Sequence, residues 1–189
     1  MSAAAVFIDK DGTLIEDVPY NVDPSRIALR EGAGEALRQM QEAGFELVLV
    51  SNQSGVALGR FNESELDAVW AHLRERLHDA GVELSAIYYC PHHPEGAITE
   101  YATACDCRKP LPGMLQRAAD ERGIALKDSW MLGDILDDVE AGRRAGCRTV
   151  LLDVGSETEW RSSHWRAPDY FASDLVAAAQ YIVGTRASC

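Results

Sequence analysis

Short apolar runs alternate with longer amphipathic segments along most of the chain, and this alternation limits the fold more than any other feature of the sequence. The apolar runs predict strands at 3–8, 45–50, 86–89, 129–132, 148–152 and 169–171. The amphipathic segments predict helices at 31–44, 62–80, 112–122, 137–145 and 173–182. Because single helices separate the strands, we expect an α/β fold with a doubly wound parallel sheet.

Length and charge limit what such a fold can do. A chain of 189 residues with 47% hydrophobic content predicts one domain, residues 1–189, that buries about 70% of its unfolded surface. The net charge of −12 argues against nucleic acid and membrane surfaces as partners, so an anionic substrate would need a local cationic pocket. No stretch of about 18 apolar residues occurs, and no signal peptide is recognisable. We therefore expect a monomeric, cytoplasmic protein.

Two closely spaced pairs of metal-ligating residues follow the third predicted strand. They are Cys90-x-His92 and Cys105-x-Cys107. Thiolate and imidazole are the ligands that zinc takes in closed structural sites, and the intervening chain is long enough to bring both pairs onto one ion. The sequence therefore predicts a zinc-binding loop at 90–107.

A disulfide is the alternative interpretation of these cysteines. A bond from Cys90 to Cys105 or to Cys107 would leave the nearby histidine without a role, so zinc is the stronger interpretation. The remaining cysteines, Cys147 and Cys189, are then free thiols, as expected in a reducing compartment.

Two aspartates follow the first predicted strand. Asp9 and Asp11 are spaced i, i+2, so both start on one side of the strand, and Gly12 permits a sharp turn that brings them together. At the C-terminal end of a parallel strand, such a pair can bind a divalent cation, attack phosphorus and shuttle a proton. A turn or helix-capping role is the alternative, whereas an EF-hand is excluded by the position of the glycine. The intervening Lys10 should face solvent or a helix.

Polar residues also follow other predicted strands. The run 51–55, Ser-Asn-Gln-Ser-Gly, can hold phosphate oxygens, although a polar loop often has this composition. After the fourth strand, Asp134 offers a hard oxygen ligand for Mg²⁺, while Asp138 can brace a neighbouring group. Acidic residues here are also favoured by the helix dipole. Arg108 and Lys109, directly after the second cysteine pair, would point cations at an anionic substrate.

In order along the chain, these segments resemble the haloacid dehalogenase (HAD) phosphohydrolases over nearly its whole length. The motifs are Asp-x-Asp-Gly-Thr at 9–13, Ser51, Lys109 and Gly-Asp-x-x-x-Asp at 133–138. More narrowly, Tyr-Tyr-Cys-Pro-His-His-Pro at 88–94 and Cys-Asp-Cys-Arg-Lys-Pro at 105–110 are similar to the D-glycero-D-manno-heptose 1,7-bisphosphate 7-phosphatase group. Histidinol-phosphate phosphatases share the zinc loop and the HAD motifs. A non-catalytic, zinc-stabilised binding protein is a third possibility.

The resemblance implies a HAD-like Rossmannoid fold without a large cap domain and a Mg²⁺-dependent phosphatase. It implies that Asp9 forms an aspartyl-phosphate, and that Asp11 protonates the leaving alkoxide and then activates water. It further implies that Mg²⁺ is bound by Asp9, the backbone carbonyl of Asp11, and Asp134.

The same resemblance implies how a small sugar bisphosphate is held. Ser51 and Lys109 would hold the transferring phosphoryl group, and Asn52 and Arg108 would lie next to the substrate. The zinc ion, with the four ligands named above, would be structural.

Two positions and one segment do not follow this pattern. Leu58 and Ile135 stand where members of the group often have basic residues, which leaves the fine specificity open. The segment 156–168 is irregular and has no assigned role. We expect its Trp160 and Trp165 to pack in the core.

Overall fold

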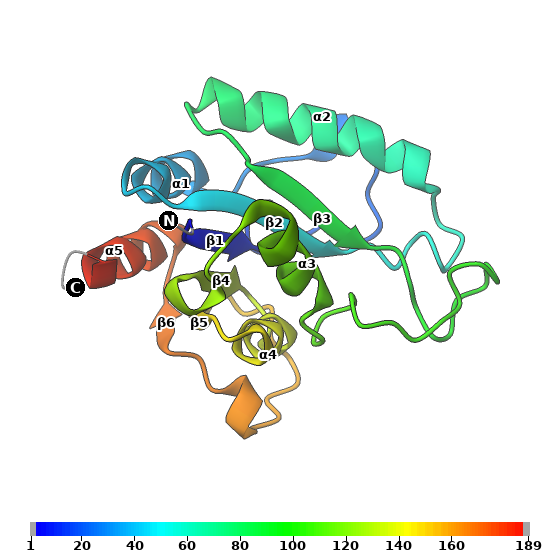
Figure 1. The fold of residues 1–189 in the computed structure, drawn as a ribbon. Coiled ribbons are helices and arrows are strands. Elements are labelled where there is room, and N and C mark those ends of the chain that lie inside the picture. Colours follow the sequence, from blue (N-terminus) through cyan, green and yellow to red (C-terminus); the bar gives the residue numbers. More distant parts are fainter. Residues whose placement is uncertain (1–2, 187–189) are drawn as a thin grey trace.

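The computed structural model describes residues 3–186, and within them it contains a six-stranded parallel sheet with helices on both faces (Figure 1). The strands are β1 Ala5–Ile8, β2 Glu46–Asn52, β3 Ala86–Cys90, β4 Trp130–Gly133, β5 Arg148–Leu152 and β6 Tyr170–Ala172. The helices are α1 Ala33–Glu42, α2 Glu63–Asp79, α3 Gly113–Arg122, α4 Leu136–Ala145 and α5 Leu175–Arg186. Short 3₁₀ helices lie at Pro24–Arg26, Leu126–Asp128 and His164–Arg166. The predicted doubly wound fold is confirmed, and no large cap domain interrupts the described residues.

Both faces of the sheet are covered, which explains why the strands are apolar throughout rather than alternating. In β1, Val6 and Ile8 belong to the core formed with α1, α2 and α5. Ala5 and Phe7 belong to the opposite core, formed with α3 and α4. All four side chains are fully buried. A central strand of this sheet therefore has no water-facing side.

The strand order β3-β2-β1-β4-β5-β6 locates the crevice where such sheets bind ligands. The chain runs outward from β1 to the edge strand β3, then returns to place β4 on the other side of β1. Residues Val6–Ile8 of β1 pair with Trp130–Leu132 of β4. This reversal opens a crevice beyond the C-terminal ends of β1 and β4. The residues that follow these two strands must therefore lie close together.

Helix α2 begins as its sequence predicts. The Asn62 side chain accepts a hydrogen bond from the Glu65 N–H at 3.1 Å, and the Glu65 carboxylate accepts one from the Asn62 N–H at 2.9 Å. This reciprocal capping box satisfies two N–H groups that have no partner within the helix.

Among residues 3–186, no helix combines the length and apolar character needed to cross a membrane.

Strand β2 extends further than predicted. It continues past Val50 because Ser51 pairs with Tyr89, and Asn52 pairs with Cys90, on the neighbouring strand β3. Ser51 and Asn52 are therefore held by a strand rather than by a loop, and their positions are fixed by the sheet.

The prediction that Trp160 and Trp165 pack in the core is wrong. They are 57% and 39% exposed. The segment that carries them is held by polar contacts instead: the Arg166 Nε donates to Glu140 at 2.7 Å, and the Arg144 guanidinium lies 5.1 Å from the Trp165 ring centre. Ion pairs with α4 thus replace the apolar anchoring that the tryptophans suggested.

Candidate active site

Three buried aspartates and one buried lysine meet beyond the C-terminal ends of β1 and β4. Carboxylate oxygens of Asp9, Asp134 and Asp138 lie within 4.8 Å of one another. The Lys109 ammonium donates to Asp9, lies 2.7 Å from an Asp138 oxygen, and donates to the Val50 carbonyl at 3.2 Å. Because none of these four residues is more than 7% exposed, water screens the cluster weakly.

The charges of this cluster do not balance, since three carboxylates face one ammonium. Burial raises the pKa of Asp9 to about 7, although Lys109 opposes this shift, and burial together with the Asp9 charge raises the pKa of Asp134 to about 6. Burial lowers the pKa of Lys109, but Asp138 and Asp9 outweigh that effect and raise it. The remaining excess of negative charge suits a divalent cation with oxygen ligands.

Two glycines make the close approach of these aspartates possible. Gly12 has a φ of +84°, and a Cβ atom there would lie 2.1 Å from an Asp134 oxygen. A Cβ atom at Gly133 would lie 2.2 Å from that of Asp138. The Thr13 hydroxyl donates to the other Asp134 oxygen at 2.8 Å. The glycines of the Gly-Thr and Gly-Asp motifs are therefore required sterically, because any side chain at these positions would collide with an aspartate of the cluster.

Asp11 lies in the turn after β1, with both carboxylate oxygens bound. The Lys10 ammonium lies 2.8 Å from Oδ1, and the Gln53 amide donates to Oδ2 at 3.2 Å. The same amide nitrogen lies 2.7 Å from the Ser51 hydroxyl oxygen. Asp11, Lys10 and Gln53 line a cavity of about 220 Å³, to which none of the three clustered aspartates contributes.

The prediction that Lys10 faces solvent or a helix is confirmed for the helix. Its side chain does face a helix, with the ammonium 5.6 Å from the Trp70 ring centre on α2. It does not face solvent, since Lys10 is only 2% exposed. The reason is that α2 covers the second face of the sheet. The contact of Lys10 with Asp11, and the contacts of Gln53, were not foreseen from the sequence.

Asn52 fixes the backbone of Lys109 from the neighbouring strand. Its side-chain oxygen accepts from the Lys109 N–H at 3.0 Å, and its amide donates to the Lys109 carbonyl at 3.1 Å. Arg108, one residue earlier, is less constrained: one guanidinium nitrogen lies 3.4 Å from the His92 carbonyl. No carboxylate in the described part of the chain forms an ion pair with Arg108, so its charge is available to a ligand.

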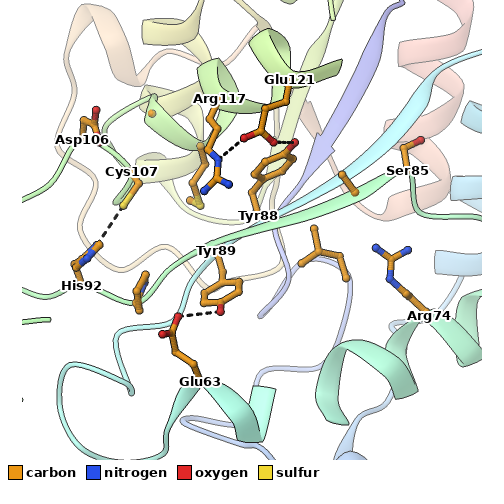
Figure 2. A pocket seen from close by; sticks show the side chains of 15 residues that line it. Glu63, Arg74, Ser85, Tyr88, Tyr89, His92, Asp106, Cys107, Arg117 and Glu121 are labelled. Carbon is orange, nitrogen blue, oxygen red and sulfur yellow. Dashed lines mark hydrogen bonds and ion pairs between the residues drawn. The ribbon is translucent and has the colours of Figure 1, made fainter. Parts of the chain in front are cut away.

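The predicted zinc ligands converge beyond the end of β3, where Figure 2 shows His92 directed toward Cys107. The Cys107 sulfur lies 3.0 Å from that of Cys90 and 3.3 Å from that of Cys105, and 3.4 Å from the His92 Nδ1 atom. Tetrahedral zinc would place sulfur ligands about 3.8 Å apart. Hydrogen bonding with Cys90 lowers the pKa of Cys107 to about 5, which favours a thiolate. The four side chains can hold a metal ion.

The cysteines of this cluster are free thiols, contrary to the disulfide alternative. Their smallest sulfur separation, 3.0 Å, exceeds the covalent distance of about 2.05 Å. Cys147 is also a free thiol, and burial raises its pKa to about 12. The predicted free thiol Cys189 lies outside the described residues.

A separate cleft of about 920 Å³ runs along the edge strand β3 (Figure 2). Its polar groups bind one another: the Tyr88 hydroxyl donates to Glu121 at 2.8 Å, and the Tyr89 hydroxyl donates to Glu63 at 2.9 Å. None of the clustered aspartates lines this cleft. It therefore lies beside the cysteine cluster rather than at the carboxylates.

Comparisons with known proteins agree on the kind of chemistry. A family model described as HAD-hydrolase-like matches residues 106–178. D-glycero-beta-D-manno-heptose-1,7-bisphosphate 7-phosphatases from Yersinia pestis and Haemophilus ducreyi are 42% and 45% identical, cover 80% of this chain, and are themselves covered over 80% and 84%. The crystal structure of D,D-heptose 1,7-bisphosphate phosphatase from B. bronchiseptica, complexed with magnesium and phosphate, superposes with a TM-score of 0.79 at 28% identity. That comparison covers 96% of this chain and 99% of the other.

Proposed function

Since this chain belongs to the heptose-1,7-bisphosphate 7-phosphatase family of HAD-like hydrolases, we propose that it hydrolyses the 7-phosphate of D-glycero-D-manno-heptose 1,7-bisphosphate. The observation that carries the proposal is the buried cluster of Asp9, Asp134 and Lys109 at the reversal of strand order. A non-catalytic binding protein would have no physical need for this unbalanced charge. The names of the relatives favour the heptose substrate over histidinol phosphate.

The reaction proceeds in two steps. An oxygen of the Asp9 carboxylate attacks phosphorus, the bond from phosphorus to the sugar oxygen breaks, and Asp11 gives its proton to the departing alkoxide. Water then attacks the aspartyl-phosphate while Asp11 takes a proton from it, which releases phosphate and restores both carboxyl groups. The two steps return the enzyme to its starting state.

Asp9, Asp134 and the backbone carbonyl of Asp11 would hold Mg²⁺, and their oxygen atoms suit that ion. When bound, Mg²⁺ supplies positive charge to the phosphoryl oxygens and to the crowded carboxylates. The excess negative charge of the buried cluster supports this assignment, because burial alone would favour protonation of the aspartates.

Ser51 and Lys109 would hold the transferring phosphoryl group. Phosphoryl transfer depends mainly on positioning and charge stabilisation, and Lys109 supplies a buried cation whose backbone is fixed by Asn52. Asn52 would lie next to the substrate, although both of its side-chain polar atoms already bind Lys109. Arg108 would contact the substrate directly.

Cys90, His92, Cys105 and Cys107 would hold a structural zinc ion. Four protein ligands leave no open position for water, so this ion would take no part in the chemistry. Its contribution would be to fix the chain immediately before the two cations of the site.

We further propose that residues 1–189 form one domain that acts as a monomer in the cytoplasm. Its partner would be a small sugar bisphosphate rather than nucleic acid or a membrane, in keeping with the net charge of −12. Sedimentation of the purified chain at micromolar concentration measures the monomeric state directly.

A phosphate-release screen tests the proposed substrate. Purified protein with Mg²⁺ is offered heptose 1,7-bisphosphate, histidinol phosphate and common sugar phosphates. We expect the highest kcat/KM for the heptose bisphosphate. A higher value for histidinol phosphate would contradict the substrate assignment, and an absence of turnover on every phosphate ester would contradict the enzymatic function.

Replacing Arg108 with alanine should lower kcat/KM only for substrates that carry a second phosphate. A guanidinium can bind a phosphate in bidentate fashion, and such a contact is worth about 1.5–3 kcal/mol, or roughly ten- to a hundredfold in kcat/KM. We expect a loss of that size with the heptose bisphosphate and little change with a small monophosphate. Lys109→Ala should lower kcat/KM for both substrates, because it removes positive charge from the phosphoryl-transfer step that both share. Steady-state kinetics on both substrates, with Arg108→Lys as the conservative variant, measure these losses. Equal losses of kcat/KM on the two substrates in Arg108→Ala would contradict the role of Arg108 in binding the second phosphate.

A further inference from the structure

The lysine between the two motif aspartates is buried in a place where packing alone does not require a charge. The Lys10 side chain is 3% exposed, and its ammonium lies 2.8 Å from an oxygen of Asp11. Burying an ammonium is unfavourable unless a partner compensates for the lost water. An apolar side chain of similar length would pack against Trp70 without that cost. The ion pair with Asp11 therefore identifies what the charge at this position does.

Lys10 acts together with Gln53, because the two donors hold different oxygens of the same carboxylate. Lys10 binds Oδ1, and Gln53 binds Oδ2 at 3.2 Å. Both donors are nearly buried, whereas the Asp11 side chain is 33% exposed and borders the 220 Å³ cavity. Without these two contacts the carboxyl group could turn about its side-chain bonds. With them, its direction relative to the cavity is fixed.

We propose that Lys10 is a positioning residue that, together with Gln53, orients the Asp11 carboxyl group toward the leaving oxygen of the substrate. This inference rests on the proposed function, in which Asp11 gives a proton to that oxygen. Proton donation requires hydrogen-bond contact with the leaving oxygen in the transition state. A misplacement of about 1 Å can reduce the rate on the order of a hundredfold.

The test compares two leaving groups that differ in their need for a proton. A sugar alkoxide must be protonated as it leaves, whereas p-nitrophenolate leaves readily without a proton. The ratio kcat/KM reports the steps up to release of the leaving group, so it isolates the donation step from later hydrolysis of the aspartyl-phosphate. For Lys10→Met, we expect kcat/KM to fall about ten- to a hundredfold with the heptose bisphosphate. With p-nitrophenyl phosphate it should change less than about threefold.

Two further variants control for charge and packing. Lys10→Arg keeps the cation and should retain most of the activity on both substrates. Lys127→Met makes the same change in net charge at an exposed position on the 3₁₀ helix Leu126–Asp128. It should leave kcat/KM for both substrates unchanged. Melting temperatures establish that each variant is folded at the assay temperature. If Lys10→Met is unfolded there, Lys10→Gln takes its place and the same ratio is measured.

Equal losses on the two substrates would overturn the proposal, because they would assign Lys10 to the fold or to the phosphoryl group. Unchanged kinetics on both would overturn it as well. The proposed function fails in a different way: the wild-type protein itself would not hydrolyse the heptose bisphosphate. The comparison would then use the alkyl phosphate that the screen identifies, and the leaving-group ratio would still decide the role of Lys10.

Discussion

Replacing Asp9 with asparagine is expected to reduce phosphate release at least about a thousandfold while the protein stays folded. Asparagine keeps the size of the side chain but removes the negative charge of the proposed nucleophile and of the proposed Mg²⁺ ligand. The fold should survive because Asp9 lies at the end of β1 rather than within its packed core, and because Lys109 keeps its ion pair with Asp138. Initial rates with the heptose bisphosphate, together with a thermal melt, measure both outcomes.

The matched control is Asp120→Asn, which makes the same chemical change on the exposed side of α3. Its activity should equal that of the wild type within about twofold, as expected for a surface substitution. If Asp9→Asn retained a tenth or more of wild-type turnover, the aspartyl-phosphate mechanism would be excluded for this chain.

Replacing Cys107 with serine is expected to remove bound zinc and to damage both stability and activity. A structural metal site contributes its binding free energy to folding, and the variant lacks one of four ligands. A loss of about 2–3 kcal/mol would lower the melting temperature by roughly 4–12 °C for a chain of this size. Activity should fall on the order of a hundredfold, because Arg108 and Lys109 follow the lost ligand directly.

Cys147→Ser is the control for this change, since it also exchanges a thiol for a hydroxyl but lies outside the cluster. Metal analysis should find one zinc per chain in the wild type and in Cys147→Ser, and much less in Cys107→Ser. If wild-type protein contained no zinc after purification without chelators, the assignment of the cysteine cluster as a zinc site would be wrong.

The fold was predictable because its signals are local and repeated. Each strand is a short apolar run, each helix carries its own pattern, and parallel strands joined by single helices allow few arrangements. The errors arose where tertiary contacts decide the outcome. β2 continues to Asn52 because β3 supplies a partner there, and the exposed Trp165 is held by Arg144 rather than by the core.

The arrangement of the candidate site was partly predictable for a related reason. Residues that follow neighbouring parallel strands must meet, so Asp9 and Asp134 could be placed together without coordinates. The pairing of individual side chains could not be predicted in this way. That Asn52 binds the backbone of Lys109, or that Lys10 binds Asp11, depends on distances that no spacing in the sequence encodes. Of the two surroundings predicted for Lys10, solvent and a helix, the structure has the helix, because α2 covers that face of the sheet.

The contacts that complete the carboxylate cluster join parts of the chain that are made at very different times. Asp9 and Lys109 are separated by 100 positions, and Thr13 and Asp134 by 121. At roughly 5–20 residues per second, a ribosome adds Asp9 to the chain several seconds before it adds Lys109 and Asp134. Until β4 docks beside β1, a nascent chain has neither Asp134 nor Asp138 near Asp9. A nascent chain that ends before Asp138 therefore lacks the complete carboxylate cluster, and we expect it to have no phosphatase activity.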